Sequence, residues 1–359
     1  MSLVNVIGFD IGGANTKVAF MRTEKSHIVD LKTASRYFPV WKDKERLGAM
    51  LLELEDEVRG SFRIDCIGVT MTAELSDSYR TKREGVNEIL TAVEKMFPTT
   101  KILILNANAQ LISLSQARME PLQVAAANWV ATGWMVSQLM RDCIVLDIGS
   151  TTTSIIPIVR GAVAAKGGTD LEKLMNGELV YTGSLRTNVV AIVHSIPIGK
   201  RVAKVASELF AQTGDVHLIL DNINEEDYTV ETVDGKGKTK QEAMARLARV
   251  VCADTEILNE REIMYIAQYV YDKQVEQVAN GLDQVYDHIE NQWDRKPAIV
   301  VTGLGRNFLA RKAAVQLGFD KVVDLEETVK HRIAKVSTAV GAGLMVASKL
   351  EGGRINWML

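Results

Sequence analysis

The sequence contains little cysteine, and its cysteines are poorly placed for cross-linking or for metal binding. Only 3 of its 359 residues are cysteine. Cys66, Cys143 and Cys252 lie far apart, and none of them belongs to a Cys-x-x-Cys pair. This spacing argues against a disulfide framework and against a structural zinc site, since both need suitably spaced thiols. We therefore expect a reducing, cytoplasmic location.

The chain also lacks long apolar runs and an excess of charge of one sign. No stretch approaches the roughly 18 apolar residues that a membrane-spanning helix needs, and the first residues do not resemble an export signal. Lys and Arg number 42 against 45 Asp and Glu, which leaves a net charge of -3. We therefore expect small-molecule substrates, and no nucleic acid or membrane as a partner, so local groups must hold any anionic ligand. The oligomeric state stays open.

One sequence pattern occurs twice, and it suggests how the chain is divided. Residues 4–20 (VNVIGFDIGGANTKVAF) and 143–159 (CIVLDIGSTTTSIIPIV) each contain a short apolar strand, Asp-Ile-Gly, a turn of small residues and a second strand. The length also favours two domains, at roughly 150 residues each. We predict an N-terminal domain over 1–140, on which a C-terminal helix at 337–350 could pack, and a second domain over 141–359 with an insertion at about 165–290.

The two predicted hairpins have the residues of a phosphate-binding site. In the first, Gly12 and Gly13 leave backbone N–H groups accessible to a phosphate, and Asn15 and Lys17 add a polar group and a cation. Asp10, at the end of its strand, is placed to hold a hydrated Mg²⁺. A glycine-rich turn capped by an aspartate is the alternative interpretation of one such hairpin alone, but its repetition favours phosphate binding.

The second hairpin replaces one glycine by a hydroxyl residue. Asp147 takes the place of Asp10, and the turn that follows supplies hydroxyl groups from Ser150, Thr151 and Thr152. A third turn, which contains Gly303 and Gly305 and follows an apolar strand, could hold a nucleotide on its exposed backbone. The same Gly-x-Gly pattern is also common in plain connections from a strand to a helix.

The order of these motifs resembles the superfamily of sugar kinases, actin and heat-shock chaperones. The resemblance rests on the two Asp-Ile-Gly hairpins, an Asn-Ala-Asn-Ala segment at 106–109, the glycine turn at 303–305 and a Gly-Ala-Gly helix at 341–343. It implies an α/β protein with two ribonuclease-H-like domains, each a mixed sheet flanked by helices, and a cleft between them. Sugar kinases of this superfamily carry a basic aspartate in the connecting segment, whereas residues 106–110 contain no carboxylate. Kinase activity is therefore not favoured.

Three further segments resemble the archaeal hydantoinase-A-like branch of this superfamily: 69–77 (VTMTAELSD), 79–85 (YRTKREG) and 181–187 (YTGSLRT). The resemblance implies a transferase that condenses 5-(aminomethyl)-3-furanmethanol diphosphate with γ-glutamyltyramine and displaces diphosphate to form an aryl furfuryl ether. One alternative is an ATP-dependent enzyme of the hydantoinase or kinase type that uses the same loops. A second is a nucleotide-dependent binding protein.

The implied reaction assigns roles to particular residues. We expect Asp10 and Asp147 to organise Mg²⁺ while the two hairpins cradle the diphosphate. Lys82 and Arg83 could add positive charge, although a solvated loop explains them equally well, and for Arg186 the alternative is an interdomain salt bridge. Glu74 could be the general base for the phenol, with a surface carboxylate as the competing interpretation.

Overall fold

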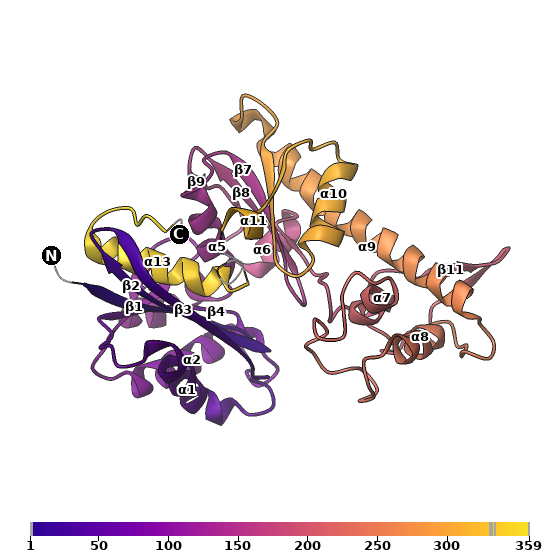
Figure 1. Cartoon of the computed structure of the whole chain (residues 1–359), viewed down its shortest axis with the longest axis horizontal. Coiled ribbons are helices and arrows are strands. Elements are labelled where there is room, and N and C mark those ends of the chain that lie inside the picture. Colours follow the sequence, from indigo (N-terminus) through magenta and orange to yellow (C-terminus); the bar gives the residue numbers. More distant parts are fainter. Residues whose placement is uncertain (1–2, 330–332, 334, 358–359) are drawn as a thin grey trace. The chain divides into compact units, whose positions relative to one another are not determined.

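The computed structural model describes residues 3–329, 333 and 335–357 (Figure 1). The chain forms two compact units: unit 1 comprises 1–143, 156–173 and 325–359, and unit 2 comprises 144–155 and 174–324. Segment 156–173, which the sequence-based division places in the second domain, thus belongs to unit 1. The physical reason is close packing at Gly133, where a side chain would collide with Ile156 and Val163.

Unit 1 is built on a six-stranded mixed sheet in the order β3-β2-β1-β4-β5-β6. Strands β1, β4 and β5 are parallel, and the other neighbours pair antiparallel. The strands are β1 (Val4–Ile11), β2 (Asn15–Glu24), β3 (His27–Tyr37), β4 (Cys66–Met71), β5 (Lys101–Leu105), β6 (Leu111–Ser113) and, apart from this sheet, β9 (Ala162–Val163). The helices are α1 (Leu47–Arg59), α2 (Lys82–Met96), α3 (Leu114–Met119), α4 (Pro121–Val124), α5 (Asn128–Ser137), α11 (Leu325–Thr328) and α13 (Ser337–Glu351), with 3-10 turns η1 (Lys44–Arg46) and η2 (Ala73–Leu75).

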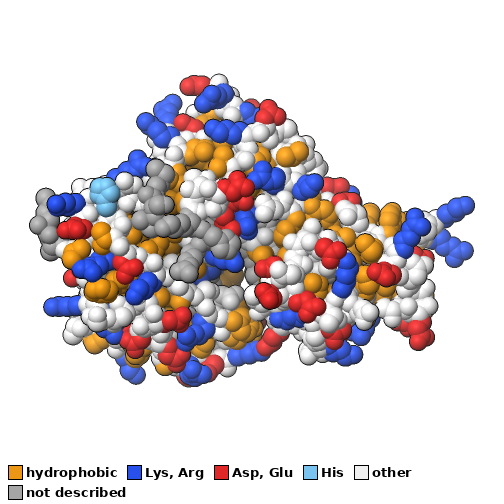
Figure 2. Space-filling view, viewed as in Figure 1, with side chains coloured by type: hydrophobic (Ala, Val, Ile, Leu, Met, Phe, Trp, Pro, Cys, Tyr) orange, Lys and Arg blue, Asp and Glu red, His pale blue; other side chains and the backbone are white. Residues whose placement is uncertain are grey.

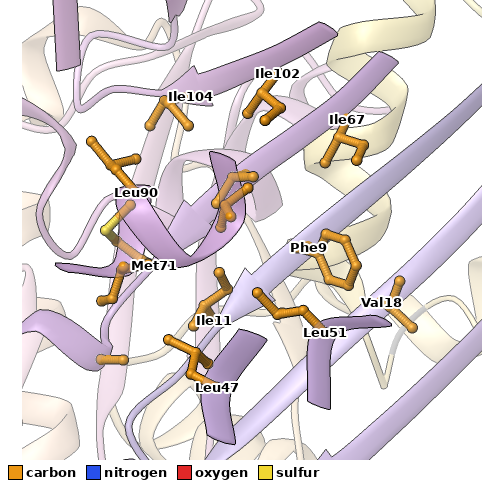
Figure 3. Packing of buried hydrophobic residues seen from close by; sticks show 14 of the residues in the cluster. Phe9, Ile11, Val18, Leu47, Leu51, Ile67, Met71, Leu90, Ile102 and Ile104 are labelled. Atoms are coloured by element: carbon orange, nitrogen blue, oxygen red, sulfur yellow. The ribbon is translucent and has the colours of Figure 1, made fainter. Parts of the chain in front are cut away.

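Strand β1 sends alternate side chains to opposite faces of this sheet, as the period of two in a strand requires. Ile7, Phe9 and Ile11 belong to the main apolar cluster of unit 1, together with residues of α1 and α2 (Figure 3). Gly8 and Asp10 therefore lie on the other face, along which α13 runs in contact with β1, β2 and β4 (Figure 1). The alternation of β1 thus places the carboxylate of Asp10 on the α13 face, away from the apolar cluster.

Helix α13 approaches β1 very closely, because glycines form the contact. A Cβ atom on Gly8 would lie 2.0 Å from the Ala339 carbonyl oxygen and 2.6 Å from the Gly343 backbone nitrogen. No side chain fits at this position without a shift of the helix. The run of small residues at 337–345 therefore serves close packing on β1.

Replacing Gly8 with alanine is expected to destabilise the protein by roughly 1–3 kcal/mol, because the new methyl group overpacks the contact between β1 and α13. Urea unfolding measures the effect. Gly353→Ala is the matched control, since a Cβ there meets nothing within 4 Å. Equal unfolding midpoints for the two variants would contradict the close approach of α13.

A second sheet has the order β10-β8-β7-β13-β14, with β9 also paired to β8. Most of this sheet belongs to unit 2, but β9 and the part of β8 from Ile156 onward belong to unit 1. Unit 2 also contains a separate hairpin of β11 and β12. The strands of this sheet and of the hairpin are β7 (Cys143–Ile148), β8 (Thr153–Val159), β10 (Leu179–Val180), β11 (Ser195–Ile198), β12 (Arg201–Lys204), β13 (Ala298–Thr302) and β14 (Val322–Asp324). The helices of unit 2 are α7 (Thr213–Ile219), α8 (Lys240–Arg249), α9 (Glu260–Ile289) and α10 (Arg311–Gln316), with the 3-10 turns η3 (Val189–Ala191) and η4 (Glu290–Gln292) and the π-helical turn η5 (Arg306–Ala310). Helix α6 (Asp170–Met175) begins in unit 1 and ends in unit 2.

The long helix α9 (Figure 1) contributes to two apolar clusters of unit 2. Its first half, from Ile263 to Val270, packs in one cluster with α7 and α8. Its second half, from Val275 to Val285, packs in another with β7, β13 and α10. Since 30 residues of α-helix span about 45 Å, this one helix extends through both apolar clusters of unit 2 and connects them.

Charged side chains of both signs are mixed over the face drawn in Figure 2. Lys and Arg gather at the projecting end of the β11–β12 hairpin, where Lys200 lies in the turn and Arg201 begins β12. No helix in the described part of the chain has the length and apolar character needed to cross a membrane.

Candidate functional site

The hairpin that follows Asp10 forms the tight turn that the sequence predicts. The Gly12 N–H donates to the Asn15 carbonyl at 3.1 Å, and a Cβ on Gly12 would lie 2.4 Å from that oxygen. Gly13 has open space where a Cβ would stand, and both glycines are half-buried. The tip of the turn is therefore backbone that a ligand can approach.

The Asp10 carboxylate is held on one side only. It is 3 % exposed, and its Oδ2 accepts a hydrogen bond from the Thr338 hydroxyl at 2.5 Å. The Lys17 ammonium lies 3.7 Å from the same oxygen. Oδ1 is buried without a hydrogen-bond partner among the described residues. Since buried polar atoms nearly always have partners, Oδ1 is suited to bind a cation or a water.

Magnesium fits this donor set. Mg²⁺ prefers oxygen ligands and commonly takes only one or two carboxylates, with waters and substrate phosphates completing its shell. Over residues 3–329, 333 and 335–357, no group of three or more His, Cys, Asp or Glu side chains is placed to hold a metal ion. An ion at Asp10 would therefore take most of its ligands from water and phosphate.

The second hairpin repeats the geometry of the first. The Gly149 N–H donates to the Thr152 carbonyl at 3.0 Å, as Gly12 does to Asn15. Asp147 ends β7 as Asp10 ends β1, and it is half-buried like Ser150, Thr151 and Thr152. The Ser150 hydroxyl oxygen has no partner in the part of the chain that the structure describes. The repeated sequence pattern thus forms one repeated structure.

The turn that contains Gly303 and Gly305 lies directly against the Asp147 strand end. A Cβ on Gly303 would stand 2.4 Å from the Ile148 carbonyl oxygen and 2.9 Å from Asp147 Oδ1. The Gly305 N–H donates to the same Ile148 carbonyl at 3.1 Å. Gly303 also has a φ of 83°, which favours glycine. Unit 2 therefore brings together Asp147, the hydroxyl turn and the glycine turn.

Glu74 is not a surface carboxylate, so the competing interpretation is wrong. It lies in η2, just beyond β4, and is 1 % exposed. Neither carboxylate oxygen makes a hydrogen bond of normal geometry with a described residue. Burial is the main cause that raises the pKa of Glu74 from 4.5 to about 7; the Lys82 charge opposes the rise and the Asp170 charge adds to it.

Packing explains why Glu74 is buried. Helix α2 approaches it at Gly85, where a Cβ would lie 2.6 Å from the Glu74 carbonyl oxygen. Weak interactions with its own backbone N–H and with that of Ala126 lower the pKa of Glu74, although less than burial raises it. Ala126 has a φ of 50°, a left-handed conformation that is unfavourable for alanine. A carboxyl with a pKa near 7 can exchange a proton at neutral pH.

The additional basic residues have different surroundings. Lys82, the first residue of α2, forms an ion pair of 2.6 Å with Asp170, whereas Arg83 is exposed. Arg186 is half-buried, and its backbone N–H donates to the Ser150 carbonyl at 2.9 Å. Lys82 thus lies near Glu74 in unit 1, and Arg186 lies beside the second hairpin in unit 2.

Residues 106–110 form a turn that Asn106 stabilises. Its side-chain oxygen accepts hydrogen bonds from the N–H groups of Asn108 and Gln110 at 3.1 and 2.9 Å. Its amide donates to the Gln110 side chain at 3.4 Å. These polar groups satisfy one another and form no acid or base.

Two residues beside the predicted site were not predicted from the sequence. Thr338 contacts Asp10 from 328 positions away, and Asp170 pairs with Lys82 from 88 positions away. Little in the sequence points to Thr338. It is a hydroxyl residue within a helix of small residues, and the sequence does not reveal which strand that helix packs on. Asp170 follows Gly167-Gly168-Thr169, a turn that could have been noticed.

Sequence comparison places the chain among known proteins. The hydantoinase/oxoprolinase family model matches residues 65–349. The (4-{4-[2-(gamma-L-glutamylamino)ethyl]phenoxymethyl}furan-2-yl)methanamine synthase of Methanocaldococcus jannaschii is 39% identical over 349 residues, which cover 97% of this chain and 99% of that protein. The synthase of the same name from Methanococcus vannielii is 40% identical over 210 residues, covering 58% of this chain and 87% of that protein.

Structure comparison concerns the fold alone. The nucleotide-free structure of an acetone carboxylase, a protein described as carrying out ATP-dependent acetone carboxylation, aligns over 96% of this chain and 70% of that chain, with a TM-score of 0.55 and 11% identity. The predicted fold of the actin and sugar-kinase type, with mixed sheets flanked by helices, is confirmed. Because the family model matches residues 65–349, the chain belongs to the hydantoinase/oxoprolinase family.

Proposed function

We propose that this protein condenses 5-(aminomethyl)-3-furanmethanol diphosphate with γ-glutamyltyramine and releases diphosphate. The observation that carries the proposal is the 39% identity, over 97% of the chain, to a synthase whose name specifies a phenoxymethyl-furan product. That product contains an ether bond between a phenol oxygen and a furan-bound CH₂ carbon. An activated furanmethanol and a tyramine phenol are the two halves that such a bond joins.

The reaction exchanges one carbon–oxygen bond for another. The bond between the furfuryl carbon and the diphosphate oxygen breaks, and its electron pair leaves with diphosphate. The phenol oxygen forms the new bond to the same carbon, and the phenol proton passes to a base. Because the electron-rich furan stabilises positive charge on the CH₂ carbon, the protein mainly has to stabilise the leaving anion and exclude water.

Backbone and hydroxyl groups of the two hairpins supply that anion stabilisation in our proposal. Gly13 presents its backbone N–H at the tip of the first turn, beside Lys17 and Asn15, whereas the Gly12 N–H is used within the turn, where it donates to the Asn15 carbonyl. In unit 2, Ser150, Thr151 and Thr152 present hydroxyls beside Arg186. Such groups stabilise developing negative charge without a broad basic surface, which agrees with the net charge of -3.

Asp10 would hold Mg²⁺ through Oδ1, the oxygen that Thr338 leaves available, and Asp147 is the corresponding carboxylate of unit 2. A bound magnesium ion supplies neutralisation of the diphosphate charge. Thr338 fixes the orientation of the Asp10 carboxylate. The Lys17 ammonium, 3.7 Å from Oδ2, adds a second positive charge at this strand end.

Glu74 is the base for the phenol in this proposal. Its raised pKa of about 7 leaves it partly ionised at neutral pH and also a strong enough base to take a proton in the transition state. The Lys82–Asp170 ion pair lies close enough to influence that pKa in both directions. Lys82 thus has a role near the base that the sequence did not indicate.

The proposal is tested by incubating the protein with Mg²⁺, the furan diphosphate and γ-glutamyltyramine. Mass spectrometry should detect the ether, and an inorganic diphosphate assay should give one equivalent per ether formed. A reaction without γ-glutamyltyramine is the control for plain hydrolysis of the diphosphate. ATP turnover without formation of the ether would overturn the proposal in favour of an ATP-dependent enzyme.

A further inference from the structure

Gln274 is a fully buried polar residue in the middle of the long helix α9. It is 0 % exposed and lies where the helix passes from the α7 and α8 cluster to the β7 and β13 cluster. An apolar side chain would suit this position if packing were its only task. A buried amide is retained without loss of stability only where its hydrogen bonds are satisfied.

Every polar atom of the Gln274 side chain is in use. The amide Nε2 donates to the Thr182 hydroxyl oxygen and to the Gly183 carbonyl, both at 2.9 Å. Its Oε1 accepts from His217 Nε2 at 3.0 Å. Gln274 therefore ties α9 to the turn at 182–187 on one side and to α7 on the other.

The orientation of this tie is fixed by His217. Burial lowers the pKa of His217 to about 3, so the ring is neutral at any ordinary pH. Asn222 lies 3.2 Å from Nδ1 and donates to it, which leaves the proton on Nε2 facing the oxygen of Gln274. The rings of Phe308 and Tyr271 enclose the imidazole at centroid distances of 4.5 and 6.0 Å. Gln274 thus has only one way to point its amide, toward Thr182 and Gly183.

The turn at 182–187 supports the phosphate hairpin of unit 2 directly. The N–H groups of Leu185 and Arg186 both donate to the Ser150 carbonyl at 2.9 Å. A Cβ on Gly183 would lie 2.6 Å from the Thr151 backbone. There is thus no free space between the two turns, and a shift of Gly183 must move Thr151 with it.

We propose that Gln274 is a positioning residue that sets the place of the Ser150–Thr151 turn for the diphosphate. It acts through Thr182 and Gly183 and touches no ligand itself. The inference rests on the proposed function, because it assumes that this turn binds diphosphate. It extends that function to a residue in the centre of α9 that no motif marks.

The test uses Gln274→Leu, which keeps much of the volume and removes all three hydrogen bonds. Affinity for inorganic diphosphate with Mg²⁺, measured by titration calorimetry, is expected to fall about 10-fold to 100-fold, as is common when a residue that orients a binding group is lost. Affinity for γ-glutamyltyramine should stay within about two-fold of the wild type. A purely structural role would weaken both ligands alike, so equal losses would overturn the inference.

Two further variants complete the experiment. Gln277→Leu is the matched control, since this glutamine lies one turn further along α9 and donates to the exposed Ala191 carbonyl, at 3.2 Å, rather than to the turn at 182–187. Thr182→Val removes one acceptor of the tie and should weaken diphosphate binding in the same direction. Both substitutions interrupt the same link between α9 and the turn at 182–187. The double variant should therefore bind diphosphate only slightly more weakly than Gln274→Leu alone.

The possible results separate the inference from the proposed function. Unchanged diphosphate affinity in Gln274→Leu overturns the inference alone. If Gln274→Leu does not fold, Thr182→Val provides the test instead. Wild-type diphosphate affinity in Thr182→Val then overturns the inference alone. A wild-type protein that binds no diphosphate overturns the proposed function and the inference together.

Discussion

Replacing Asp10 with asparagine is expected to lower the turnover number for ether formation by about 10³-fold, the upper end of what loss of one electrostatic group costs an enzyme. The side-chain oxygen of the asparagine can still accept the hydrogen bond from the Thr338 hydroxyl. The uncharged NH₂ group then takes the position of Oδ1, the oxygen that we propose binds magnesium. An NH₂ group binds no magnesium ion. The variant should therefore also need far more Mg²⁺ for half-maximal activity, measured by magnesium titration.

The stability of the Asp10→Asn protein should not fall with its activity. Asp10 is a buried carboxylate with one oxygen that no described residue hydrogen-bonds, and removing such a charge relieves an unfavourable burial. Urea unfolding should place the variant at or above the wild type. Asp30→Asn, on the outer strand of the same sheet, is the control and should keep full activity. Wild-type activity in Asp10→Asn would disprove the metal role of this residue.

The two hairpins could be predicted from the sequence because their determinants are local. Gly12 and Asn15, or Gly149 and Thr152, are three residues apart, and each pair forms the same backbone hydrogen bond. Repetition then made the pattern specific, since one Asp-Ile-Gly turn is common and two in register are not. Local hydrogen bonding of this kind depends little on the rest of the fold.

The environment of these hairpins could not be predicted, because distant segments create it. Whether Oδ2 of Asp10 has a partner depends on α13, and α13 reaches β1 only because Gly8 and Gly343 have no side chains. The same limitation applies to segment 156–173 and its place in unit 1. Contacts of this kind follow from tertiary packing, on which short-range sequence patterns carry little information.

Glu74 shows the same limitation in a single residue. In the sequence it stands among polar residues after a strand, where a solvated carboxylate is the ordinary expectation. Close approach of α2 at Gly85 instead encloses it, and burial then dominates its pKa. The residue type and its position after a parallel strand were visible in advance, but the property that makes it a base was not.

The second large effect is expected from Glu74→Gln, which should lower the turnover number about 10²-fold to 10³-fold if Glu74 takes the phenol proton. In the wild type, kcat/KM should rise with pH through about 7, because the base must lose its own proton first. The variant should lack this rising limb while the affinity for diphosphate stays unchanged. A rate profile over pH 5 to 9 measures both. Asp77→Asn, an exposed carboxylate three residues away, is the control and should keep the wild-type profile.

Glu74→Gln should lower activity at neutral pH, whereas its free energy of unfolding relative to the wild type should rise from low to neutral pH. This combination distinguishes a functional carboxylate from a structural one. In the folded wild type Glu74 keeps its proton up to about pH 7, whereas in the unfolded chain it loses that proton near its ordinary pKa of 4.5. Raising the pH from 4.5 to 7 therefore favours the unfolded state of the wild type, by about 3 kcal/mol in total. Glu74→Gln does not titrate, and any penalty for its buried amide is the same at every pH. The free energy of unfolding of the variant relative to the wild type should thus rise by that amount between pH 4.5 and 8, and a constant difference would show that Glu74 is ionised and satisfied in the folded protein.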